Sequence, residues 1–223
     1  MEQAIARDPY YGPALAWAAF CCYRLFHDSQ SEDPEADRRK GIDFARRALE
    51  VAGEDPSVLA NAAQALAFFG EDIGAMTALV DRALALNPSY ARGWHISGLL
   101  RLWAGQPDMA IEHVEAAVRL SPRARIGTSM SVLGGAYFLA QRFDEAVPKL
   151  LLAIQEDPSN PGPCRWLAAC YAHMGRLDEA REIVARLRSI TSVVMPDIRH
   201  VLMNAEHREL VLSRLRLAVG EEA

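Results

Sequence analysis

The sequence lacks the features that mark membrane-spanning and exported proteins. No apolar run approaches the roughly 20 residues that a helix needs to cross a bilayer. The start of the chain, Met1–Pro9, carries three charged residues where a signal peptide would be apolar. We therefore expect a cytoplasmic protein that does not associate with membranes.

Cysteines are few, and their spacing fits neither zinc nor redox motifs. The four are Cys21, Cys22, Cys164 and Cys170. An adjacent pair and a pair six residues apart form no CxxC motif. We interpret all four as reduced thiols in the core of a cytosolic protein, and we expect no bound metal.

The sequence also lacks an excess of positive charge. Its formal net charge is −5 and its pI is near 5.7, which gives no general attraction to nucleic acid or to anionic membranes. Arg119, Arg123 and Arg125 form one local cluster that could bind a phosphate or a carboxylate. A solvated loop explains this cluster better, because no aromatic residues alternate with the arginines. We expect no nucleic-acid partner.

No pattern of catalytic residues emerges. The histidines are His27, His95, His113, His173, His200 and His207, and they form neither an HExxH nor an HxxxH motif. The glycine pair at 134–135 lies within an apolar stretch, which indicates close helix packing rather than a phosphate loop. The acidic pairs at 144–145 and 178–179 fit the first turn of a helix, where the dipole favours acids. We predict no catalytic residue, no cofactor and no metal site, and we expect that this chain is not itself an enzyme.

What the sequence does contain is a repeat with a period near 34 residues. Prolines recur at Pro9, Pro56, Pro88, Pro122 and Pro158, at intervals of 47, 32, 34 and 36 residues. The clearest repeat is Ala91–Pro122, whose markers at offsets 4, 8, 15, 20, 27 and 32 are Trp94, Gly98, Gly105, Ala110, Ala117 and Pro122. These offsets resemble the marker positions of the tetratricopeptide repeat (TPR), a helix-turn-helix unit.

The marker residues have physical roles that predict the helices. Small residues at offsets 8 and 20 let two helices approach closely, glycine permits the turn, and proline ends the second helix. Besides the reference repeat, we predict helices over Gly12–Phe26, Glu35–Val51, Ser57–Phe69, Asp72–Leu86, Ala124–Ala140, Phe143–Glu156, Pro161–Met174 and Leu177–Ile190. The predicted fold is all-α, a right-handed α-solenoid of about five TPR units.

The predicted domains follow from this pattern. Residues 1–9 are the end of a truncated repeat, residues 10–190 form the TPR array, and residues 191–223 form capping helices. Within the cap we predict a short helix over Asp197–Met203 and a longer one over Ala205–Val219, with Asn204 as its N-cap. Because the chain begins inside a repeat, we infer a fragment of a longer protein or a protein whose first repeat has decayed.

In a TPR stack, the first helix of each pair lines a concave groove. The predicted protein-binding residues of this groove are Phe20, Tyr23, Arg24, Asn61, Phe68, Arg92, His95, Leu99, Trp103, Phe138, Arg165 and His173. Rows of exposed aromatic residues usually mark a partner surface, although any single ring could instead pack against a neighbouring helix. The groove lacks the lysine and asparagine set with which chaperone-binding TPR proteins hold a terminal carboxylate, so that activity is not expected.

Several stretches resemble a narrower family. Ala4–Tyr11, Ala83–Tyr90, Gly175–Ala180 and the closing Leu- and Arg-rich helix are similar to the C-terminal TPR region of bacterial adenylate/guanylate cyclase-type proteins and of winged-helix transcriptional regulators. The resemblance implies a catalytic or DNA-binding domain upstream of Met1. No cyclase catalytic residue can be assigned within this chain, because the strand pattern and the metal-binding aspartates of that domain are absent.

These observations support one leading hypothesis and two rivals. The leading hypothesis is a non-catalytic interaction and regulatory module, whose groove binds a peptide, a partner domain, an upstream domain of the same protein or a second copy. The first rival is the regulatory part of a cyclase, or an activity that the motifs do not reveal. The second rival is a homodimer formed through the Leu-rich C-terminal helix.

Overall fold

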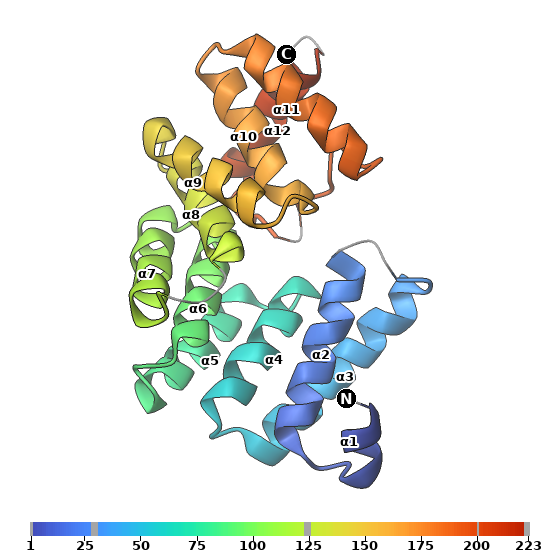
Figure 1. Ribbon diagram of the computed structural model, residues 1–223. Helices are drawn as coiled ribbons and strands as arrows, with labels where there is room; N and C mark the ends of the chain where they lie inside the picture. Colours follow the sequence, from blue (N-terminus) through green and yellow to red (C-terminus); the bar gives the residue numbers. More distant parts are fainter. Residues whose placement is uncertain (1, 28–30, 123–125, 200, 221–223) are drawn as a thin grey trace. The chain divides into compact units, whose positions relative to one another are not determined.

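A computed structural model describes residues 2–27, 31–122, 126–199 and 201–220 (Figure 1). In these residues all regular secondary structure is helical, which confirms the predicted all-α fold. The chain divides into two compact units, Met1–Leu100 and Arg101–Ala223, here called the N-terminal and C-terminal units and treated separately. Of the residues discussed above, Arg123, Arg125 and His200 lie outside the described residues.

The N-terminal unit consists of consecutive helix pairs. It contains α1 (Glu2–Arg7), α2 (Gly12–His27), α3 (Pro34–Ala52), α4 (Pro56–Phe68), α5 (Ile73–Leu86) and the first ten residues of α6 (Ala91–Trp103). Helix α2 packs against α3, α4 packs against α5, and α2 also packs against α4. Helix α4 is buried from Val58 to Phe68 and carries five alanines in that stretch. Short side chains let its neighbours approach closely, as the repeat pattern predicts.

The C-terminal unit repeats this arrangement and adds a final helix. It contains the end of α6, then α7 (Pro107–Leu120), α8 (Gly127–Leu139), α9 (Phe143–Glu156), α10 (Pro161–His173), α11 (Leu177–Ile190) and α12 (Ala205–Val219). The pairs α8 with α9 and α10 with α11 are in contact, and α12 packs against α10 and α11. Helices α9, α11 and α12 occupy the predicted residues. The predicted division into repeat array and cap at residue 190 stays a prediction.

Four turns between paired helices contain a residue with a left-handed backbone conformation. Gly70, Gly105 and Gly175 have φ values of 98°, 78° and 75°, in the left-handed region that glycine adopts without steric cost. The turn between α8 and α9 uses Gln141 at φ 59° in the same role. The pattern of marker glycines therefore predicts three of these turns, whereas the fourth is made by a residue that carries a Cβ in a strained conformation.

The recurring prolines have two different structural roles. Asn87, Ser121 and Asp157 are the C-caps of α5, α7 and α9, so the proline after each stands just beyond a second helix, as predicted. Asp55 differs, because its Oδ1 accepts hydrogen bonds from the backbone N–H groups of residues 57 and 58 as the N-cap of α4. The proline after Asp55 therefore begins a helix.

The glycine pair in α8 is a packing site, as the sequence indicates. A Cβ at Gly134 would overlap the side chain of Leu150 on α9, and one at Gly135 would lie 2.9 Å from Trp166 on α10. Helix α8 can therefore approach both neighbours only because these two positions have no side chain. No phosphate-binding role is needed to explain them.

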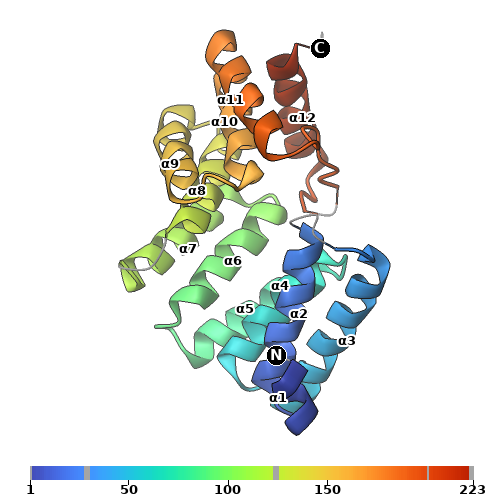
Figure 2. The same ribbon diagram turned by 45° about the vertical axis from the view of Figure 1, so that its right-hand side comes forward.

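The predicted short helix over Asp197–Met203 is wrong. Among the described residues of the connection between α11 and α12 there is only one turn, in which the N–H groups of Val201 and Leu202 donate to the carbonyl of Ile198. The N–H of Met203 donates instead to the carbonyl of Trp103 at 2.8 Å. This long-range hydrogen bond takes the place of the bond that a helix would form to the carbonyl four residues earlier. Figure 2 shows this connection as a non-helical stretch that leads into α12.

Candidate protein-binding surfaces

The structure divides the predicted groove residues by exposure. Five are buried, namely Tyr23, Asn61, Phe68, Trp103 and Phe138. Seven are partly exposed, namely Phe20, Arg24, Arg92, His95, Leu99, Arg165 and His173. The buried set contains most of the aromatic rings, so those rings belong to the helix contacts of each unit. A role in partner binding stays a prediction for all twelve residues, and the partly exposed ones are its direct candidates.

Rings in the N-terminal unit form a continuous cluster. The ring centroids of Trp17 and Phe20 lie 5.5 Å apart, those of Phe20 and Tyr23 5.5 Å apart, and those of Tyr23 and Phe68 4.7 Å apart. Phe69 continues the cluster at 5.6 Å from Phe68. Tilted and edge-to-face rings at these distances attract one another, which explains why a predicted row of exposed aromatics is mostly interior.

Arg92 joins this cluster to helix α4. Its guanidinium carbon lies 4.8 Å from the ring centroid of Trp17 and 4.5 Å from that of Phe20. Its Nε donates a hydrogen bond to Oδ1 of Asn61 at 2.9 Å. Two rings and an amide therefore hold the cation in one orientation. Burial lowers the pKa of Arg92 from its usual value, and the group stays charged at neutral pH.

Two donors of this arrangement lack an acceptor among the described residues. They are Nη2 of Arg92 and Nδ2 of Asn61, and both atoms are buried. A buried donor without an acceptor costs about 1–3 kcal/mol. The pair therefore suits a ligand that brings an oxygen acceptor, such as a peptide carbonyl or a carboxylate. Trp17 has a larger role here than the groove offsets indicate, because it contacts Arg92 although it lies outside the predicted set.

His95 follows Arg92 on α6 and is held neutral. Burial, reinforced by the positive charge of Arg92, lowers the pKa of His95 to about 4. At pH 7 this imidazole therefore contributes no charge to the surface. The basic character that the sequence suggests for this part of the groove comes from arginine alone.

In the C-terminal unit, Phe138 and His173 face a second aromatic cluster. Phe138 lies 5.5 Å from Phe143 and 5.6 Å from Trp166, measured between ring centroids. The ring of His173 stacks on that of Phe143 at 4.1 Å with an interplanar angle of 25°. Burial, with a contribution from the charge of Arg214 on α12, lowers the pKa of His173. This histidine is therefore also neutral near pH 7.

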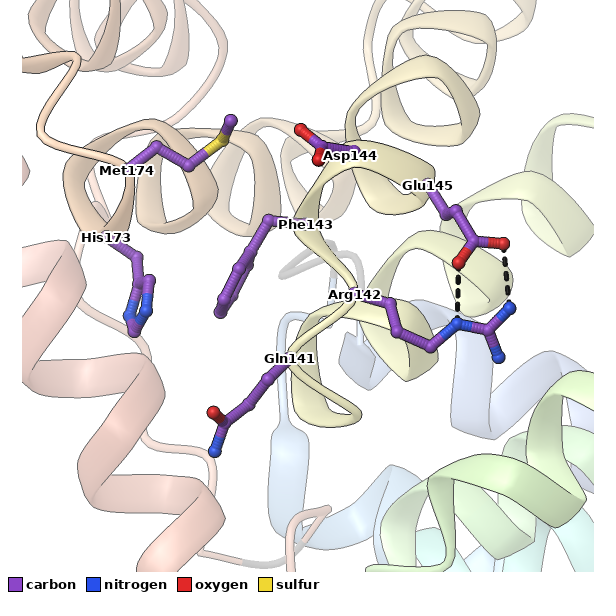
Figure 3. Close-up of a pocket in the computed structure, with 7 residues that line it drawn as sticks. All are labelled: Gln141, Arg142, Phe143, Asp144, Glu145, His173 and Met174. Carbon is purple, nitrogen blue, oxygen red and sulfur yellow. Dashed lines mark hydrogen bonds and ion pairs between the residues drawn. The ribbon is translucent and has the colours of Figure 1, made fainter.

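The stacked pair borders a shallow pocket of about 390 Å³ (Figure 3). Its lining residues are Gln141, Arg142, Phe143, Asp144, Glu145, His173 and Met174. Figure 3 shows the guanidinium of Arg142 turned toward Glu145, with which it forms hydrogen bonds of 2.6 and 2.7 Å. That ion pair satisfies both partners, and the pocket contains no nucleophile that is set against a base.

The same ion pair recurs one repeat later. Arg176 binds Glu179 through two hydrogen bonds, and its guanidinium lies 4.4 Å from the ring centroid of Tyr171, as Arg142 lies 4.7 Å from that of Tyr137. Both glutamates occupy the first turn of a helix, as predicted. Their arginine partners were not predicted from the sequence, although a spacing of three residues at both turns indicates them.

Arg165 on α10 is bound by the chain's own backbone. Its Nη2 donates to the carbonyl of Val193 at 2.5 Å, and its Nε donates to the carbonyl of Val194 at 3.3 Å. Burial lowers the pKa of this guanidinium, which remains charged. Two donors of Arg165, a predicted groove residue, are therefore already bound by backbone carbonyls of the same chain.

The thiols and other titratable groups indicate no reactive centre. Cys22, Cys164 and Cys170 are buried, and burial raises the pKa of Cys22 to about 11 and that of Cys170 to about 12. Cys21 is exposed, so its assignment to the core was wrong. Over the described ranges, His, Cys, Asp and Glu side chains form no group of three that could hold a metal. None of the helices described is long and apolar enough to cross a membrane.

Comparison with known proteins agrees with the repeat pattern. Residues 137–192 match the family model described as Tetratricopeptide repeat. A stretch of 103 residues, 46% of this chain, is 31% identical to the Small glutamine-rich tetratricopeptide repeat-containing protein 2 of Mycosarcoma maydis. That match covers 29% of the relative, so the chain corresponds to less than a third of the length of this curated protein.

Two solved structures are similar in fold. The TPR protein TTC0263 of Thermus thermophilus aligns with a TM-score of 0.60 and 21% identity, over 88% of this chain and 98% of the other. YrrB, described as a TPR protein with an unusual peptide-binding site, aligns with a TM-score of 0.54 and 22% identity, over 80% of this chain and 92% of the other. At these identities the likeness shows the fold alone.

The helix pairs, the left-handed turns and the similar solved structures together define the class: the chain has the fold of a tetratricopeptide-repeat protein, and residues 137–192 match the family itself. Repeats of this type mediate protein–protein interactions through the surfaces that their stacked helices create. The narrower resemblance to the TPR region of cyclase-type and winged-helix proteins stays a prediction, because the proteins named above include neither. Sequence upstream of Met1 would test it.

Proposed function

We propose that this chain is a non-catalytic interaction module that binds a peptide segment of a partner protein through the first helices of its pairs. In the N-terminal unit these helices are α2, α4 and α6. They carry the partly exposed Phe20, Arg24 and Leu99 around the buried Asn61 and the partly exposed Arg92. YrrB supports the proposal, since that TPR protein has a similar fold and is described as having a peptide-binding site.

One observation carries the proposal. Nη2 of Arg92 and Nδ2 of Asn61 are unsatisfied donors on neighbouring helices, fixed by the Arg92–Asn61 hydrogen bond and covered by aromatic rings. Apolar contacts with Phe20 and Leu99 would supply binding free energy, while a carbonyl or carboxylate oxygen of the peptide would pair with the two donors. The surface therefore favours an extended segment that has an apolar anchor beside an oxygen acceptor.

The test is selection from a random peptide library on the full chain, followed by measurement of Kd. Phe20→Ala with Leu99→Ala should weaken the selected peptides at least about tenfold, because these side chains supply the apolar contacts. A matched control is Val51→Ala with Leu86→Ala, which changes exposed apolar residues on the second helices α3 and α5. The control should leave Kd unchanged within about twofold.

Two results would contradict the proposal. One is equal binding by wild type and the Phe20/Leu99 variant. The other is failure to select any peptide, together with a mass in light scattering that stays monomeric across a concentration series. A concentration-dependent dimer that the Phe20/Leu99 variant abolishes would identify a second copy of the chain as the partner. Persistence of such a dimer in that variant would place the contact elsewhere.

A further inference from the structure

The connection between α11 and α12 lies against the first helices of the C-terminal unit. We call its described residues, 191–199 and 201–203, the strap. It contains β-branched residues and Pro196, which disfavour helix, and it forms a single turn. Leu202 is 3% exposed, so the strap is packed rather than solvated at that end.

Both ends of the strap bind predicted groove residues through the peptide backbone. Near its start, the guanidinium of Arg165 donates to two successive carbonyls, those of Val193 and Val194. At its end, the N–H of Met203 donates to the carbonyl of Trp103, the last residue of α6. The side chain of Val193 is 46% exposed, so this end is held by its backbone more than by its side chains.

The helix that follows the strap lies near a further predicted groove residue, His173. Helix α12 packs against α10, and the charge of Arg214 on α12 acts on His173 at the end of α10. Arg208 of α12 in turn donates hydrogen bonds to the carbonyls of Leu202 and Met203 at 2.7 and 2.9 Å. Trp103, Arg165 and His173 are therefore all approached by residues that follow α11.

We infer that the strap is an intramolecular ligand that closes the peptide-binding surface of α10, and that a non-helical segment of a partner opens this surface by replacing the strap on Arg165. The carbonyls of Val193 and Val194 can both accept from one guanidinium because the chain bends at residues 194 and 195, whereas successive carbonyls of extended backbone point to opposite sides. A partner peptide without helical structure can adopt the same bend and present the same two acceptors. This inference rests on the proposed function, because it assigns an occupant to one of the first helices.

Competition within one chain sets the expected behaviour. A tethered segment has an effective concentration in the millimolar range, so a free peptide of similar affinity cannot displace it at ordinary concentrations. The apparent affinity of the surface for a free peptide falls by the fraction of molecules in which the strap is released. Loosening the strap should therefore reveal binding that the wild-type chain conceals.

The experiment uses a fluorescent peptide with the sequence of residues 189–199, titrated against the full chain. In the loosened variant, residues 193–196 are all replaced by glycine, which raises the entropic cost of holding the strap in one conformation and leaves Arg165 intact. The peptide should bind this variant at least about tenfold more tightly than wild type. Adding Arg165→Met should remove that gain, whereas adding Arg188→Met, an exposed arginine on α11, should keep it.

Equal binding to wild type and loosened variant, no binding to the loosened variant, or indifference to Arg165→Met would each overturn the inference. If the loosened variant does not fold, hydrogen exchange on single variants of the full chain decides. Arg165→Met should speed exchange of the Met203 amide more than Arg188→Met does, and equal rates would overturn the inference. These results do not depend on Phe20 and Leu99, so failure here and failure of the proposed function are distinguishable.

Discussion

Two arginines on first helices, Arg92 in the N-terminal unit and Arg165 in the C-terminal unit, have different partners. Arg92 is stacked against two rings and binds one side-chain oxygen, with a donor left over. Arg165 binds two backbone carbonyls of the strap. On similar helices, the guanidinium of Arg92 therefore keeps one buried donor without an acceptor, whereas that of Arg165 binds two backbone carbonyls.

The surface of a repeat therefore depends on the segments that pack against it as well as on the repeat itself. In the N-terminal unit the nearest residues are rings of the same and neighbouring helices. In the C-terminal unit the surface meets residues that lie outside the repeat pattern.

Replacing two turn glycines by alanine should destabilise the chain to different extents, because only one of them lies against the segment that follows the strap. Gly105 has φ 78°, and a Cβ there would lie 2.8 Å from the Cβ of Asn204, which follows the strap. Gly70 has φ 98° with open space around it. We expect Gly105→Ala to destabilise the fold by about 2–4 kcal/mol, from strain and overlap, and Gly70→Ala by about 1–2 kcal/mol, from strain alone.

Urea unfolding of both alanine variants measures this difference. Both glycines have a positive φ, so the difference between the two losses of stability measures the contact with Asn204. Equal losses for the two variants would show that the C-terminal segment does not press on the turn, and the comparison would fail at that point.

His95 should make the N-terminal unit sensitive to acid. Its folded-state pKa is lowered to about 4 from the ordinary 6.5, so the unfolded chain takes up a proton first as pH falls. The stability that this imidazole contributes is complete above about pH 6.5, decreases between pH 6.5 and 4 by at most roughly 1.4 kcal/mol per pH unit, and then levels off. We expect a total loss of at most roughly 3 kcal/mol, since the pKa shift spans about 2.5 pH units.

The measurement is denaturant unfolding of wild type and His95→Gln across that pH range. The variant should lose most of the slope, because the titrating group is gone. His173→Gln is the matched variant in the C-terminal unit, where the pKa of the histidine is also lowered. A slope unchanged by His95→Gln would contradict the assignment of a neutral imidazole beside Arg92.

Exchanging each arginine for lysine should separate the two environments. An ammonium cannot stack flat against the rings of Trp17 and Phe20, nor bind two carbonyls in a fixed fork. We expect Arg92→Lys and Arg165→Lys each to cost about 1 kcal/mol. Hydrogen exchange should quicken in α4 for Arg92→Lys and at Met203 for Arg165→Lys. If both variants quicken the same segment, the contrast between the units is wrong.

The smallest expected effect is a gain. Gln141 holds φ 59° where the other turns have glycine, so Gln141→Gly should relieve strain and stabilise the chain by about 0.5–1 kcal/mol. The reverse exchange at the next turn, Gly175→Gln, should lose a similar amount. Thermal unfolding of the two variants checks the signs, and a loss for Gln141→Gly would mean that its side chain has a structural role at the pocket of Figure 3.

Local rules made most of the helices predictable. Asn204 caps α12 by accepting from the N–H of His207 at 3.0 Å, and glycine makes the turn wherever the repeat places one. Exposure was not predictable in the same way. The groove offsets put Tyr23, Phe68 and Phe138 on a surface, but contacts with other rings bury them. Trp17 lies outside those offsets and yet holds Arg92.

The helical repeat can be deduced from local sequence, because spacing, capping and turn chemistry act between residues a few positions apart. Tertiary structure decided what each surface residue meets. Arg92 binds Asn61 across 31 positions, and Arg165 binds Val193 across 28. Only packing brings such partners together, because no local pattern encodes an acceptor that lies so far away in the sequence. The described residues within 197–203 belong to the strap rather than to the predicted helix, and the N–H of Met203 donates to the distant carbonyl of Trp103.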